Sequence, residues 1–172
     1  MHPAQPLTAA LVSKIHEQIE RTSHLIELLP ADSPNWQPEI PAAWPVATLL
    51  GHLLECCAGL CAVLAAAEPE RLAHFRALRD LPVNHTTAPA EALSRLALYR
   101  ARIDEGFALV ADAGLARMIP TVFVPEGESV LTLLLGNLEH LINHKHQLFT
   151  YLKLMGVPVG TADLYRFRGM PE

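Results

Sequence analysis

Histidines are the residues of this sequence best suited to chemistry. There are nine in 172 residues, and His140 and His144 are four positions apart in a segment with helical periodicity. Residues at this spacing differ by about 40° around a helix axis, so both imidazole rings project from one face. Neutral imidazole is a common ligand of Zn, Ni, Fe and Co ions. The pair predicts part of a metal site, but chance and core packing explain such a pair about equally well.

A third ligand would have to come from another segment. His52 is the best candidate, because it lies in the most apolar window of the chain, residues 48–67. An imidazole buried there needs a polar partner or a metal. His16 and His24 are alternatives in a more polar segment, and each is a weaker candidate than His52.

Other polar residues near these histidines have less certain roles. Glu55 follows His52 by three residues, and we expect it to orient a ligand imidazole, accept a proton as a catalytic residue, or enter the coordination shell. An ion pair with another helix is an equal alternative. Cys56 is one turn from His52, and we expect it to be a small core residue. His146 is about 160° from His144 around the helix, so we expect it at the surface or in contact with the C-terminal tail.

Substrate contacts are poorly marked in the sequence. Asn143 lies three residues after His140, and we expect it to hydrogen-bond near the site. Tyr99, Arg100 and Arg102 are further candidates for substrate contacts, although no pattern selects them.

Four long helical segments are expected to position these residues. In the first segment apolar residues recur every three or four positions, and each of the others has a start or stop signal such as Pro45 or Gly156. Five prolines between residues 30 and 45 exclude a regular helix there. The expected helices are 7–29, 45–67, 90–113 and 129–155, with a short helix at 69–78, a loop at 81–89 and an extended connection at 118–127.

This pattern predicts one all-α domain, residues 1–172, folded as a four-helix bundle. The loops after the first and third helices are longer than an up-and-down hairpin needs, so we expect a crossover topology. The C-terminal tail is expected to be irregular, with Tyr165, Arg166, Phe167 and Arg168 packing across the bundle.

Composition limits the partners and the compartment. Apolar residues make up 51% and charged residues 18%, with a net charge of −5 and no basic cluster, so we expect no nucleic-acid partner. We expect no signal peptide at the N-terminus and no membrane span, because the apolar window contains His52 and Glu55 and lacks basic flanks. Three cysteines fall within six residues without a disulfide framework, which fits the cytoplasm.

Two motifs resemble those of a known family. Residues 44–53 read Trp-Pro-Val-Ala-Thr-Leu-Leu-Gly-His-Leu, and residues 140–148 read His-Leu-Ile-Asn-His-Lys-His-Gln-Leu, with Gly-Val-Pro at 156–158. The chain resembles the DinB-like (DinB/YfiT-like) metalloenzymes, which have a Trp before the first metal histidine and a His-x3-His pair followed by Gln-Leu and Gly-Val-Pro. Lys145 and His146 stand where Arg and Gly are usual, which leaves the subfamily open.

The resemblance implies a helical bundle in which His52, His140 and His144 form a facial triad for one divalent metal ion. Zn and Ni suit three imidazoles best, and Fe is also possible. Family members include thiol-dependent S-transferases and a maleylpyruvate isomerase. We therefore expect a small-molecule substrate, a low-molecular-weight thiol, and activation of that thiol or of water in an S-transferase-like or hydrolase-like reaction. A homodimer is also expected.

Two other functions fit the same residues. A non-enzymatic bundle that binds a metal or a small molecule would use the same triad. A plain helical dimerisation module would bind no metal, and its histidines would be ordinary packing residues.

Overall fold

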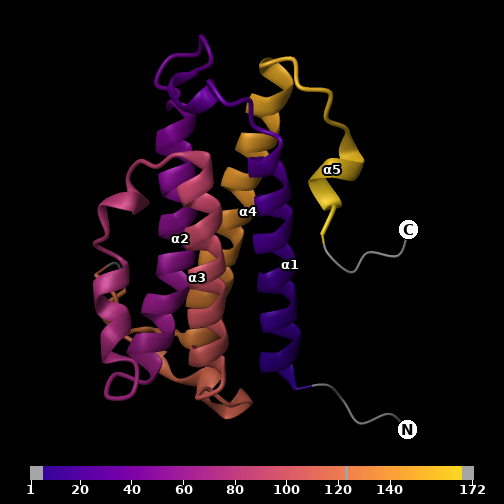
Figure 1. Ribbon diagram of the computed structural model, residues 1–172. Helices are drawn as coiled ribbons and strands as arrows, with labels where there is room; N and C mark the ends of the chain where they lie inside the picture. The colour runs from indigo at the N-terminus through magenta and orange to yellow at the C-terminus, as the bar shows by residue number, and fades with distance from the viewer. Residues whose placement is uncertain (1–5, 123, 168–172) are drawn as a thin grey trace, which may run out of the picture.

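Four long helices form the body of the protein (Figure 1). The computed structural model describes residues 6–122 and 124–167, and the predicted all-α bundle is confirmed within them. The long helices are α1 (Leu7–Glu27), α2 (Val46–Ala67), α3 (Pro89–Phe107) and α4 (Val130–Leu154). The shorter ones are η1 (Ser33–Asn35), η2 (Ala73–Leu78), η3 (Pro82–Asn84), η4 (Asp112–Ala116) and α5 (Thr161–Tyr165), and two strands pair antiparallel, β1 (Met118–Ile119) and β2 (Glu128–Ser129).

The helices are connected with a crossover. Helices α1 and α2 each pack against both α3 and α4, so α1 and α2 lie diagonally across the bundle. Helices α2 and α3 run in the same direction, and residues 68–88 return along the outside of the bundle between them (Figure 1). The sequence analysis had instead expected the crossover connections to be the loops after the first and third helices. Those loops cross the ends of the bundle and join diagonal helices.

Helix α2 forms the centre of the hydrophobic core. It contacts α3, α4, η2 and η3, which explains why nearly every turn of it is apolar. Among the described residues, it is the one helix long and apolar enough to cross a membrane. In this structure 72% of its most apolar window is buried within the bundle, as the sequence analysis expected of a core helix.

Helix α3 ends earlier than predicted, at Phe107 rather than residue 113. Beyond the end of the helix, Asp112 takes part in a tertiary contact. Its carboxylate accepts hydrogen bonds from the backbone N–H groups of Leu7 and Thr8, each 2.9 Å long, and from the Thr8 hydroxyl. These bonds satisfy orphan donors at the start of α1 and lower the pKa of Asp112.

Three other local predictions need correction. The short helix expected at 69–78 is a 3-10 helix confined to its last six residues. The connection expected at 118–127 begins with β1, which pairs with β2 just beyond the end of that segment. The C-terminal tail is not wholly irregular, since α5 lies against α1 (Figure 1). His24 Nε2 lies 3.1 Å from Asp163 of α5, and the Tyr165 ring packs over Arg21 of α1. Arg168 lies outside the described residues.

Two helical glycines provide a test of how the 68–88 connection packs. A Cβ atom added at Gly51 would lie 2.5 Å from backbone atoms of His85 and Thr86, whereas one added at Gly136 would meet nothing within 4 Å. We expect Gly51→Ala to lower the free energy of unfolding by about 1–3 kcal/mol, because the connection must shift. Gly136→Ala should raise it by about 0.5–1 kcal/mol. Urea denaturation measures both, and equal effects would contradict this packing.

Candidate metal centre

Three histidines converge between α2 and α4. His52 comes from α2, and His140 and His144 come from successive turns of α4. One nitrogen from each ring lies within 4.8 Å of the others, and Nε2 of His52 is 3.0 Å from Nε2 of His140. Within residues 6–122 and 124–167, this is the one cluster of three such side chains close enough to share a metal ion. The structure thus brings together the three histidines that the sequence singled out.

Two of the three rings are oriented by a residue three positions further along their own helix. His52 Nδ1 lies 2.7 Å from Oε2 of Glu55, and His144 Nδ1 lies 2.9 Å from Oε1 of Gln147. Since both partners accept a hydrogen bond, we assign the proton to Nδ1 in each ring. In both rings Nε2 then carries the lone pair that a metal ion would use.

An aromatic wall covers one side of the triad. The Trp44 ring lies 4.9 Å from the His52 ring and 5.7 Å from the His144 ring, measured between centroids. The Tyr151 hydroxyl donates to the Trp44 carbonyl at 3.1 Å and accepts from Gln147 Nε2 at 3.2 Å. This chain of hydrogen bonds connects Trp44 to the residue that orients His144.

The histidines of α4 are held in the neutral form. Burial lowers the pKa of His140 and of His144, and the nearby His52 ring lowers both further. Glu55 acts in the opposite direction on both rings, as does the hydrogen bond that His144 donates to Gln147, but burial is the larger effect. Neutral imidazole is the form that binds a metal, so the site is suited to a cation near neutral pH.

A groove of about 590 Å³ opens beside the triad. His140 and Glu55 lie at its metal-site end, and its walls come from α2, α4 and the segment 119–122. Most of the lining is apolar, including Ala62, Val63 and Leu133. Ionic side chains also reach it from Arg79 and Glu128. A groove of this character suits a small organic molecule with an apolar body.

A family model for the DinB superfamily matches residues 14–148. The chain belongs to the DinB superfamily. This membership confirms the family that the two sequence motifs indicated. No curated protein sequence matches the chain.

Solved structures share the DinB fold at low sequence identity. The chain is similar to the DinB-like protein YjoA from Bacillus subtilis, with a TM-score of 0.67 and 20% identity over 92% of this chain and 99% of that one. It is also similar to a mycothiol-dependent maleylpyruvate isomerase, with a TM-score of 0.60 and 14% identity over 82% of this chain. A histidine-to-alanine variant of that isomerase matches at 13% identity. The match spans 60% of the isomerase, and at these identities the likeness shows the fold.

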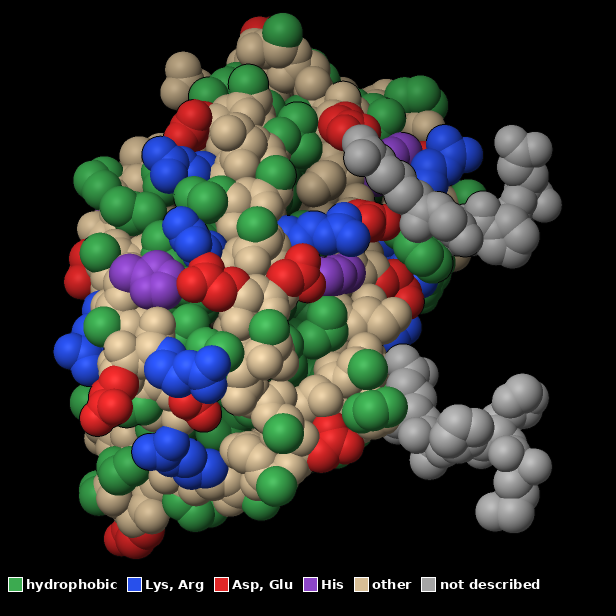
Figure 2. Space-filling model, turned by 60° about the horizontal axis from the view of Figure 1, so that its bottom comes forward, with side chains coloured by type: hydrophobic (Ala, Val, Ile, Leu, Met, Phe, Trp, Pro, Cys, Tyr) green, Lys and Arg blue, Asp and Glu red, His purple; other side chains and the backbone are tan. Residues whose placement is uncertain are grey.

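The remaining histidine candidates lie away from the DinB triad. His146 is exposed, and its ring centroid is 6.0 Å from that of Phe149, as its helical position predicted. His16 Nε2 lies 2.9 Å from Asp104, and His24 faces Asp163. Histidines and acidic side chains lie side by side on the face in Figure 2, where basic and acidic groups are interspersed.

Cys56 is also accounted for by the core. Its thiol donates to the carbonyl oxygen of His52 at 3.2 Å, and burial raises its pKa to about 12. A thiol in this state is a poor metal ligand near neutral pH. Cys56 therefore fits the core position that the sequence analysis expected.

Three proposed substrate contacts serve other purposes. Tyr99 is fully buried, and its hydroxyl donates to Asn84 Oδ1 at 2.7 Å, which fastens the 68–88 connection to α3. Arg100 pairs with Glu20, and Arg102 pairs with Glu105.

The structure places Gln147, and not Asn143, beside the triad. Asn143 was expected near the triad but lies on a pocket toward α1. Gln147, which sequence reasoning used only as a family match, orients His144. Gln147 follows His144 by three residues, as Glu55 follows His52, and this equal spacing could have indicated from the sequence that Gln147 orients His144.

The lowered pKa values predict how the stability of the metal-free protein depends on pH. Below about pH 6.5, the ordinary histidine pKa, the unfolded chain takes up protons on His140 and His144 more readily than the folded chain. The free energy of unfolding should therefore fall as pH decreases from about 6.5 to 5, and it should level off above that range. Urea denaturation across this range tests the prediction. The double variant His140→Gln/His144→Gln should flatten the dependence of the unfolding free energy on pH, and His146→Gln should not. Equal slopes in the wild type and in both variants would contradict the prediction.

Proposed function

We propose that this DinB superfamily member is a metal-dependent enzyme in which His52, His140 and His144 hold one divalent cation. Zn or Ni is the preferred ion, and Fe is the alternative. The reaction is activation of a low-molecular-weight thiol, or of water, for attack on an electrophile. The observation that carries the proposal is the convergence of three imidazole nitrogens within 4.8 Å at the end of a groove.

The residues fit such an ion in number and in chemistry. Two of the rings are already oriented through Nδ1, and all three donors are imidazole nitrogens. Three protein ligands leave a coordination position open, which is the arrangement of catalytic rather than structural sites. When bound, the cation would act as a Lewis acid and lower the pKa of a coordinated thiol or water, so that the nucleophile forms near neutral pH.

Glu55 is the catalytic residue supplied by the chain in this proposal. Its carboxylate contacts His52 Nδ1, yet its side chain is 37% exposed and lies on the groove. It is therefore within reach of a molecule in the groove and can take the proton released by a thiol or water. The same contact holds the His52 ring in place.

The groove suggests the kind of substrate. Its volume is in the range that fits small molecules, roughly 300–1,000 Å³. The apolar walls favour an apolar body, and Arg79 provides a cation for an acidic substituent. The similarity to a mycothiol-dependent isomerase supports a thiol co-substrate.

A turnover assay tests this function. Purified protein would be assayed against pairs of low-molecular-weight thiols and electrophiles, and against hydrolysable esters, with and without a strong chelator. We expect turnover that the chelator abolishes and that added Zn or Ni restores. Bound metal without turnover on any pair would favour the non-enzymatic binding bundle instead.

A further inference from the structure

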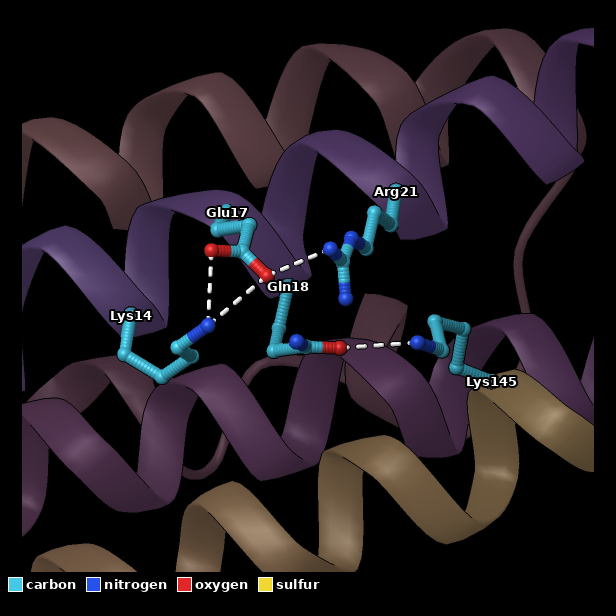
Figure 3. Close-up of polar contacts among 5 residues, drawn as sticks. All are labelled: Lys14, Glu17, Gln18, Arg21 and Lys145. Carbon is cyan, nitrogen blue, oxygen red and sulfur yellow. Dashed lines mark hydrogen bonds and ion pairs between the residues drawn. The ribbon is translucent and has the colours of Figure 1, made fainter. Parts of the chain in front are cut away.

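A buried lysine lies on the side of α4 that faces α1. The Lys145 side chain is 4% exposed, and its ammonium donates to Oε1 of Gln18 at 2.7 Å (Figure 3). Among the described residues, Gln18 is its hydrogen-bond partner and no carboxylate pairs with it. A buried ammonium held only by a neutral amide lacks the opposite charge that usually accompanies burial.

The carboxylate of Glu17, which lies in the same group of side chains, is already engaged. Glu17 lies 2.7 Å from Lys14 Nζ and 2.6 Å from Arg21 Nη2, so both of its oxygens bind other cations (Figure 3). Lys14, Arg21 and Lys145 together carry three positive charges against one negative charge on Glu17. Two positive charges in this cluster are therefore not balanced by Glu17.

Arg21 has free hydrogen-bonding capacity at the same place. Its side chain is 14% exposed, and its buried Nε has no hydrogen-bond partner among the residues that the structure describes. The guanidinium is held by the rings of Tyr165 and Phe167, whose centroids lie 5.1 and 5.3 Å away. The terminal nitrogen that does not bind Glu17 is directed toward the Gln18–Lys145 contact in Figure 3.

These groups surround a pocket of about 340 Å³. Arg21 and Gln18 reach it from α1, Lys145 from α4 and Tyr165 from α5, while Asn143 and His146 lie on its exposed rim. The metal centre lies on a different side of α4, because His144 faces His52 of α2 while Lys145 faces α1.

We propose that this pocket is a second binding site, which takes a small oxyanion, the phosphate or carboxylate group of a small molecule, between Arg21 and Lys145. Arg21 and Lys145 both line this cavity, and their guanidinium and ammonium groups are the donors used for such anions. Hydrogen bonds from these donors are strengthened by their charge. The amide of Asn143 adds a neutral donor at the rim. The bound anion supplies the counter-charge that Glu17 does not.

Calorimetric titration tests the site with two probes, sodium phosphate and sodium acetate, at constant ionic strength in sodium chloride. We expect saturable binding of at least one probe, and the preferred probe identifies phosphate or carboxylate as the recognised group. Lys145→Met and Arg21→Gln should each weaken this binding at least about tenfold, since each removes a charge-assisted hydrogen bond.

Two controls separate this site from other causes. Lys153→Met removes an exposed cation from the same helix that does not line the pocket, and it should leave binding unchanged. His140→Ala should also leave it unchanged, because His140 does not line this pocket. If the anion were held at the metal centre instead, His140→Ala would lose the binding and Lys145→Met would keep it. If neither probe binds saturably, or if Arg21→Gln binds as the wild type does, the proposal is wrong. Thermal unfolding of each variant confirms that it is folded.

Discussion

Replacing His140 by alanine is expected to weaken the binding of a divalent metal by at least about a hundredfold. Loss of a group that merely orients a ligand costs 10–100-fold in affinity, and loss of a ligand should cost more. His140 faces His52 directly, with 3.0 Å between their Nε2 atoms. Elemental analysis of purified protein, with competition against a chromophoric chelator, measures the change.

His146→Ala is the matched control. It removes an imidazole from the same helix, six residues away, but from the exposed side. We expect this variant to keep the wild-type metal content and affinity. If the two variants lost metal equally, the bound metal would not lie in the triad.

Replacing Glu55 by glutamine is expected to lower turnover by about a hundredfold to ten-thousandfold, the usual contribution of a general base. The amide oxygen can still accept the hydrogen bond from His52 Nδ1, 2.7 Å away in the wild type, so the ring stays oriented. An amide cannot take up a proton, however. The loss should therefore appear in kcat, while the metal content of the protein remains near that of the wild type.

Glu139→Gln tests the specificity of this effect. Glu139 is an exposed carboxylate next to His140, and it does not line the groove. Its replacement should leave turnover unchanged. Full activity in Glu55→Gln would show that Glu55 only orients His52 and that the proton acceptor is another group.

The long helices could be predicted from the sequence because each has its own apolar periodicity and its own stop signal. Residues 108–113 were wrongly assigned to the third helix, because their path depends on a contact far away in the sequence. Asp112 binds the first turn of α1, and nothing near position 112 indicates that partner. The short α5 was missed for the same reason, since His24 and Arg21 of α1 hold it in place.

The candidate site was predictable to a similar extent. Helical spacing paired His140 with His144, and the offset of three residues pointed to Glu55. Only the family resemblance joined His52 to them, because which faces of α2 and α4 meet depends on how the helices pack. The groove beside the triad was not predictable, since the loop residues 119–122 form part of its wall.

Locating a metal ion directly tests the central claim. Crystals of the protein loaded with Zn or Ni would be measured at the absorption edge of that metal. We predict one anomalous difference peak per chain, bonded to a nitrogen of His52, His140 and His144 at about 2.0–2.1 Å, as for zinc-bound imidazole. A fully loaded crystal with no peak between these rings, or with its peak on other residues, would contradict the account.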